Sequence, residues 1–148
     1  MKYTVDITIN LPRAKVIELF DNPDNMKAWQ PDLVSFEPVS GTLGQPGAKS
    51  ILHYKMGKRD VVMTETVTKN NLPDEMAGTY ETKGVYNEIS NRFEAINQNQ
   101  TKWTSENEFK FSGFMILIGF FMKSAFPKQT LQFMNQFKTF AESTAEDN

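Results

Sequence analysis

The sequence contains no cysteine and a single histidine, His53. Without cysteine the chain forms no disulfide, no thiolate zinc site and no iron–sulfur cluster, and it has no cysteine nucleophile. One histidine would need carboxylates alone to complete a metal site, so we expect neither a metal nor a cofactor. The chain also lacks an excess of either charge: 16 basic and 18 acidic residues give a net charge of −2. Since no basic field is available to hold phosphates, we expect no nucleic-acid partner.

Long apolar runs are missing as well. The most apolar run, residues 113–122, ends at Lys123, whereas a membrane-spanning helix needs about 20 residues. The N-terminus alternates polar and apolar residues and lacks the apolar core of a signal peptide. We therefore expect a cytoplasmic protein without an integral membrane segment. Its 148 residues fit a single domain over 1–148, with residues 143–148 as a frayed tail.

Aromatic residues and methionine are abundant: 12 Phe, 8 Met, 4 Tyr and 2 Trp. Nine of the phenylalanines lie between Phe109 and Phe140. Phenylalanine and methionine offer bulky, adaptable surfaces to an apolar ligand, but they also fill ordinary cores. Both interpretations stay open for each of these side chains.

Alternating residues predict a first strand over 2–10. Two short helices should follow, one starting at Pro12 and one that carries Met26 and Trp29 before Pro31. From Leu33 onward the apolar period remains two, which predicts six more strands near 33–39, 48–56, 60–69, 75–83, 85–96 and 101–111. The breaks between them are short, so antiparallel pairing is favoured over parallel crossovers.

After residue 113 the apolar period changes to that of a helix. Phe126, Thr130, Phe133, Phe137 and Phe140 recur at spacings of three or four, which predicts an amphipathic helix ending near Glu142. A proline at 127 falls inside this pattern and predicts a kink or break between 114–125 and 127–142. The predicted class is α+β: about seven antiparallel strands in a curved sheet wrapped on a long C-terminal helix.

Short segments spread over nearly the whole chain carry a family resemblance. They are Trp29-Gln30-Pro31, the turn with Gly41, Gly44 and Pro46-Gly47, Met63-Thr64-Glu65-Thr66-Val67, Asn91-Arg92-Phe93-Glu94, Trp103-Thr104-Ser105-Glu106-Asn107-Glu108-Phe109 and Lys128-Gln129-Thr130-Leu131. In this order they resemble the START-like (SRPBCC) superfamily, in particular its bacterial polyketide cyclase/dehydrase-like branch. The superfamily also includes lipid-transfer and birch-pollen-allergen-like proteins. The resemblance implies the helix-grip fold with a deep apolar cavity between sheet and last helix, and it supplies no shared catalytic signature.

The prediction for function is binding or transport of a small hydrophobic or amphipathic ligand, a lipid or an aromatic metabolite, in that cavity. The alternative is a polyketide cyclase/dehydrase-type enzyme acting on an aromatic or polyketide substrate there. A third hypothesis is a stress or interaction domain with an incidental cavity. The predicted ligand-binding residues are Trp29, Met63, Tyr80, Asn87, Asn91, Trp103, Asn107, Phe109, Phe133 and Phe137.

Glu65 is the one acid that alternation places on the inner face, beside Met63 and Val67. Buried there, it would have a raised pKa and could serve as a general acid or base. Alternatively it faces solvent or pairs with a lysine or arginine. Tyr80 and His53 are the other candidate proton-shuttling residues. The asparagines, instead of binding ligand, could pair across neighbouring strands and fix the register.

The stretch from Phe114 to Phe126 is apolar nearly all round. Such a helix cannot bury every face against its own sheet. Three alternatives follow: a buried first half of the closing helix, a patch that forms a homodimer, or a surface that contacts a bilayer transiently to collect lipid.

Overall fold

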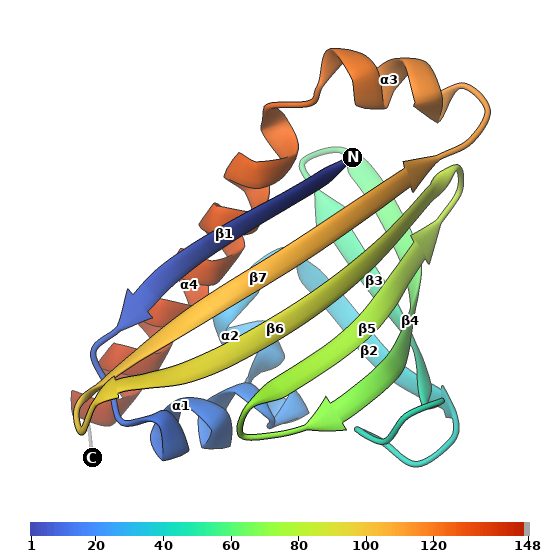
Figure 1. Ribbon diagram of the computed structural model, residues 1–148. Coiled ribbons are helices and arrows are strands. Elements are labelled where there is room, and N and C mark those ends of the chain that lie inside the picture. Colours follow the sequence, from blue (N-terminus) through green and yellow to red (C-terminus); the bar gives the residue numbers. More distant parts are fainter. Residues whose placement is uncertain (147–148) are drawn as a thin grey trace.

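The computed structural model describes residues 1–146 and contains a seven-stranded antiparallel sheet that curves around a long C-terminal helix (Figure 1). The strands are β1 (Lys2–Ile9), β2 (Leu33–Ser40), β3 (Lys49–Met56), β4 (Arg59–Asn71), β5 (Glu75–Thr82), β6 (Val85–Asn97) and β7 (Gln100–Phe111). Their order is β1-β7-β6-β5-β4-β3-β2, so strands β2 to β7 follow chain order and β1 pairs with β7. The seven predicted strands are confirmed, with ends within two residues of those expected.

Two short helical segments connect β1 to β2, as predicted. Helix α1 (Arg13–Phe20) starts directly after Pro12. The 3-10 helix η1 (Pro23–Asn25) is capped by Asn22, whose side-chain oxygen accepts a hydrogen bond from the Asp24 amide at 3.0 Å. It leads into α2 (Met26–Trp29), and Figure 1 shows α1 at the lower end of the sheet and α2 behind the strands, on the side of α4.

The C-terminal region forms two helices, α3 (Met115–Phe121) and α4 (Ala125–Glu146). The predicted break is confirmed, but it lies at residues 122–124 rather than at Pro127. The proline sits in the first turn of α4, where its missing amide hydrogen costs no helical hydrogen bond. Helix α4 also extends to Glu146, four residues beyond the predicted end, because Ala145 packs against the core. The last two residues of the predicted frayed tail lie outside the described residues.

The core is an aromatic cluster between α4 and the end of the sheet near α1 and α2. The Phe137 ring lies 5.5 Å from the Trp103 ring and 5.2 Å from the Trp29 ring. Phe93 stacks on Trp103 at 5.7 Å. The apolar stripe of α4 supplies Met134, Phe137 and Ala141 to this cluster, which explains why α4 lies on the inner face of the sheet.

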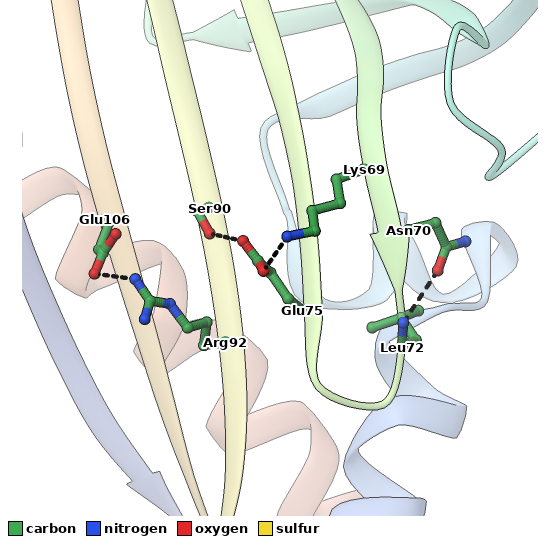
Figure 2. Close-up of polar contacts among 7 residues, drawn as sticks. All are labelled: Lys69, Asn70, Leu72, Glu75, Ser90, Arg92 and Glu106. Carbon is green, nitrogen blue, oxygen red and sulfur yellow. Dashed lines mark hydrogen bonds and ion pairs between the residues drawn. The ribbon is translucent and has the colours of Figure 1, made fainter.

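The outer face of the sheet is polar. Lys69 of β4 binds Glu75 of β5 at 2.9 Å, and the Glu75 carboxylate accepts a second hydrogen bond from Ser90 of β6 at 2.8 Å (Figure 2). Beside them Arg92 pairs with Glu106 across β6 and β7. Such charged cross-strand pairs suit a solvent-exposed face, and the opposite face packs against α4. No helix in residues 1–146 is long and apolar enough to span a membrane.

Candidate functional site

A row of polar and aromatic side chains crosses the inner face of the sheet. Glu65 of β4 pairs with Tyr80 of β5, Tyr80 with Asn87 of β6, and Asn87 with Phe109 of β7. Directly paired residues share a face, and alternation along β6 gives Asn87 the same face as the core residue Phe93. The row therefore faces α4, as the sequence predicts.

Glu65 and Tyr80 form the strongest polar contact in this row. The Tyr80 hydroxyl donates a hydrogen bond to Glu65 Oε2 at 2.6 Å. Burial raises the pKa of the Glu65 carboxyl, and the hydrogen bond from Tyr80 offsets part of this rise. Burial together with the nearby Glu65 charge also raises the pKa of Tyr80 well above its ordinary value. No lysine or arginine in residues 1–146 forms an ion pair with Glu65, so its partner is the phenol alone.

A buried phenol lies next to this pair. The Tyr54 hydroxyl of β3 donates a hydrogen bond to Gln30 Oε1 at 2.6 Å. Burial, helped by the charge of Glu65, raises the pKa of Tyr54. Sequence reasoning did not select Tyr54 or Gln30 as site residues. The available signal was the alternation in β3, which turns Tyr54 inward beside the buried Leu52.

The inner-face asparagines are hydrogen-bonded within the sheet. Asn87 Nδ2 donates to Asn107 Oδ1 at 3.4 Å, and Asn107 Nδ2 donates to Ser105 Oγ at 2.9 Å. The Asn91 side-chain oxygen accepts a hydrogen bond from Trp103 Nε1 at 2.9 Å. These contacts support the alternative in which the asparagines fix the strand register. These hydrogen bonds also offset most of the free-energy cost of burying the amide groups.

Trp29 carries a buried donor without a partner. Its side chain is buried, with its ring 5.0 Å from the Phe133 ring, and its Nε1 has no hydrogen-bond partner among residues 1–146. Leaving such a donor unsatisfied costs about 1–3 kcal/mol. An acceptor on a bound molecule, or a water, would remove this cost.

The predicted ligand-binding residues fall into two regions. Trp103 and Phe137 belong to the closed core, with 3% and 0% of their surfaces exposed. The others that line the open part of the inner face are only partly buried: Met63, Tyr80, Phe109 and Phe133. Phe126 of α4 joins this region, with its ring 4.9 Å from that of Phe109, and it was not among the predicted ligand-binding residues.

Hollows lie on both sides of the sheet. One of about 50 Å³ lies on the helix side and is lined by residues that include Gln30, Tyr54, Met56 and Phe133. It is far smaller than a typical ligand pocket of about 300–1,000 Å³, so a metabolite fits there only if side chains such as Phe133 move. A broad hollow of about 710 Å³ lies across the outer face of β1, β5, β6 and β7. It includes neither Glu65 nor Tyr80, so it is separate from the inner-face row.

The structure does not bring His53 to this site. His53 lies on β3 between the inward-facing Leu52 and Tyr54, so its side chain points to the outer face. There its Nε2 is 3.2 Å from Asp60 Oδ1. His53 therefore cannot exchange protons directly with Glu65, which faces the other side of the sheet. Among residues 1–146 no three histidine, aspartate or glutamate side chains gather to hold a metal ion.

A curved seven-stranded antiparallel sheet on a long C-terminal helix, with short helices after β1, defines the helix-grip fold of START-like proteins. Residues 1–139 match the family model described as "Polyketide cyclase / dehydrase and lipid transport", and the chain belongs to this family. No protein with a curated description matches the chain in sequence.

Solved structures of similar fold come from several bacteria. A conserved protein from Geobacillus kaustophilus is 16% identical with a TM-score of 0.78, and the match covers 97% of each chain. A START superfamily protein from Mycobacterium smegmatis is 9% identical with a TM-score of 0.77, covering 97% of this chain and 98% of that one. The Zhui aromatase/cyclase from Streptomyces sp. R1128 is 14% identical with a TM-score of 0.75, covering 96% and 93%. At these identities the likeness establishes the fold alone.

Proposed function

We propose that this protein binds or transports a small hydrophobic or amphipathic molecule between the inner face of the sheet and α4. The observation that carries the proposal is the Glu65–Tyr80 pair, a half-buried hydrogen-bonded acid with no basic partner in residues 1–146. A few placed polar groups in an otherwise apolar interior are typical of a ligand site. The family description, which includes lipid transport, supports the same function.

Different residues of the inner face would contact the apolar and the polar parts of such a ligand. Its apolar part packs on Met63, Phe109 and Phe133, which are partly buried and adaptable in shape. A hydroxyl or another donor on its polar end binds the Glu65 carboxylate. An acceptor elsewhere on the ligand can bind the unpartnered Trp29 Nε1.

The test begins with native mass spectrometry of the purified protein and organic extraction of any released molecule. We expect a species of defined mass, and we expect a panel of fatty acids and aromatic metabolites to contain at least one stabilising compound. A ligand at 100 times its Kd adds about 2.7 kcal/mol to the free energy of unfolding. An empty protein that no compound in the panel stabilises would contradict the proposal.

A matched pair of variants then locates the site. Tyr80→Phe removes the phenol that holds Glu65, so the affinity for the extracted or stabilising compound should fall about tenfold, as for the loss of one hydrogen bond. Tyr86→Phe changes a phenol on the outer face of the same hairpin and should leave the affinity unchanged. Equal affinities of the two variants would place the ligand elsewhere.

The second candidate function is a cyclase or dehydrase acting in the same interior. It is favoured by the raised pKa of Glu65 beside a phenol, since a carboxyl with a raised pKa holds its proton more firmly and is suited to general acid–base catalysis. Glu65→Gln should then abolish turnover of an aromatic or polyketide substrate while binding remains. Glu81→Gln, on the outer face, is the control and should keep full turnover. Turnover that survives Glu65→Gln would exclude this mechanism.

A further inference from the structure

Helix α3 and its flanking residues expose large apolar side chains that nothing in residues 1–146 covers. Between 50% and 75% of the surface of each is exposed: Phe114, Ile116, Leu117, Phe120, Phe121 and Met122. Figure 1 shows α3 at the end of the sheet where β7 stops, beyond the part of the sheet that α4 covers. Monomeric proteins rarely expose an apolar patch of this kind without a binding role.

One side of α3 is held against the sheet. A Cβ at Gly119 would lie 2.7 Å from the Phe111 ring, and one at Gly84, in the β5–β6 turn, would lie 2.7 Å from Met115. These close approaches fix α3 on the end of β7 and the neighbouring turn. The rest of the helix therefore presents its apolar side chains outward in a defined orientation.

The charges that follow and flank α3 are mainly positive. Between Glu108 and Glu142 the sequence has four lysines and no acidic residue, and one of the four, Lys138, lies far along α4 and pairs with Glu142. Lys123 follows α3 directly, and Lys83 lies in the β5–β6 turn that contacts Met115. The nearest acid in β7, Glu108, is already paired with Lys2 and Lys110.

We propose that α3 docks on an anionic lipid bilayer. Its apolar side chains insert at the boundary between headgroups and acyl chains, while the surrounding lysines bind the negative headgroups. A second copy of the chain is the less suitable occupant, because a two-fold contact through α3 would bring two sets of the same lysines into one interface. This proposal goes beyond the binding function and does not depend on it.

The docked orientation brings the aromatic end of the inner face to the membrane. Phe111, which α3 covers, lies 5.9 Å from Phe109 and 5.5 Å from Phe126, ring to ring. These are the partly buried rings at the open part of the sheet. A bilayer bound by α3 would thus adjoin the same rings that we assign to ligand binding.

Vesicle co-sedimentation of the full chain tests the proposal. We expect binding to vesicles of phosphatidylcholine mixed with phosphatidylglycerol, and much weaker binding to phosphatidylcholine alone. Binding should weaken as salt rises, because the Debye length falls from about 10 Å at 0.1 M to about 3 Å at 1 M. Lys123→Gln should lower the affinity about fivefold, and Phe120→Ser with Phe121→Ser at least tenfold.

Two controls separate docking from a general loss of structure. Val39→Ser and Ile96→Ser change side chains that are 50% and 51% exposed on β2 and β6, so they should bind vesicles like the unmodified chain. Phe121→Trp adds an exposed reporter whose emission should shift to the blue with anionic vesicles. Trp29 and Trp103 are buried, so their emission should stay constant.

Three results would overturn the proposal. The first is absence of binding to the mixed vesicles, and the second is equal binding to both vesicle types. The third is a dimer in analytical ultracentrifugation that the Phe120→Ser, Phe121→Ser variant converts to a monomer, because α3 would then bind a second copy.

Discussion

Glu65 and Glu75 are glutamates whose surroundings shift their pKa values in opposite directions. Burial raises the pKa of Glu65, whereas hydrogen bonds from Lys69 and Ser90 lower the pKa of Glu75. The contribution of Glu65 to stability is therefore full below its unfolded value of 4.5 and is lost as pH rises through its folded pKa. The contribution of Glu75 is present above 4.5 and is lost as pH falls through its folded pKa.

Two isosteric variants test this difference by urea unfolding across the acidic to neutral range. Relative to the unmodified protein, Glu65→Gln should become more stable as pH rises above 4.5. Glu75→Gln should be the less stable protein above 4.5, and the difference should vanish as pH falls. Parallel pH profiles for the two variants would mean that Glu65 is not buried as described.

Single residues of the site were partly predictable. Alternation alone placed Asn87 and Asn107 on the inner face, and both are buried. The Tyr54–Gln30 hydrogen bond was not predictable, because it depends on how α2 packs against β3 across 24 residues of sequence. The outward position of His53 follows from the alternation of β3, but only once the buried face of that strand is known.

At the scale of elements, α3 and α4 use phenylalanine in opposite ways. Phe137 of α4 is fully buried in the aromatic core, so Phe137→Ala should lower the free energy of unfolding by about 3–5 kcal/mol. Phe121 of α3 is 75% exposed, so Phe121→Ala should change it by no more than about 0.5 kcal/mol. Chemical denaturation of the two variants measures both effects, and a large cost at Phe121 would show that α3 is buried in solution.

The elements themselves were the most predictable level of the structure. A sustained period of two identified all seven strands, because each strand has one wet face and one dry face. The exact break between α3 and α4 was less predictable, since both segments are apolar and Pro127 suits the first turn of a helix as well as its end. The register shift between Val67 and Lys69 leaves no mark in the apolar pattern.

At the scale of the whole molecule, the pairing of strands predicts a gradient of local stability. β7 is hydrogen-bonded on both sides, to β1 and to β6, and it carries buried side chains of the core. The exposed α3 has few such contacts. In hydrogen exchange measured by mass spectrometry, amides of β7 should open only with global unfolding, whereas those of α3 should exchange first. Protection of α3 equal to that of β7 would contradict this gradient.

The pairing of β1 with β7 also sets the timing of folding during synthesis. Lys2 pairs with Glu108 and Ile9 with Thr101, so β1 leaves the ribosome long before its partner exists. At about 5–20 residues per second, the delay is roughly 5–20 s. Helix α4, which binds Tyr3 through Thr130 at 2.7 Å, is made later still. The apolar face of β1 must therefore remain unpaired in the nascent chain until β7 has been made.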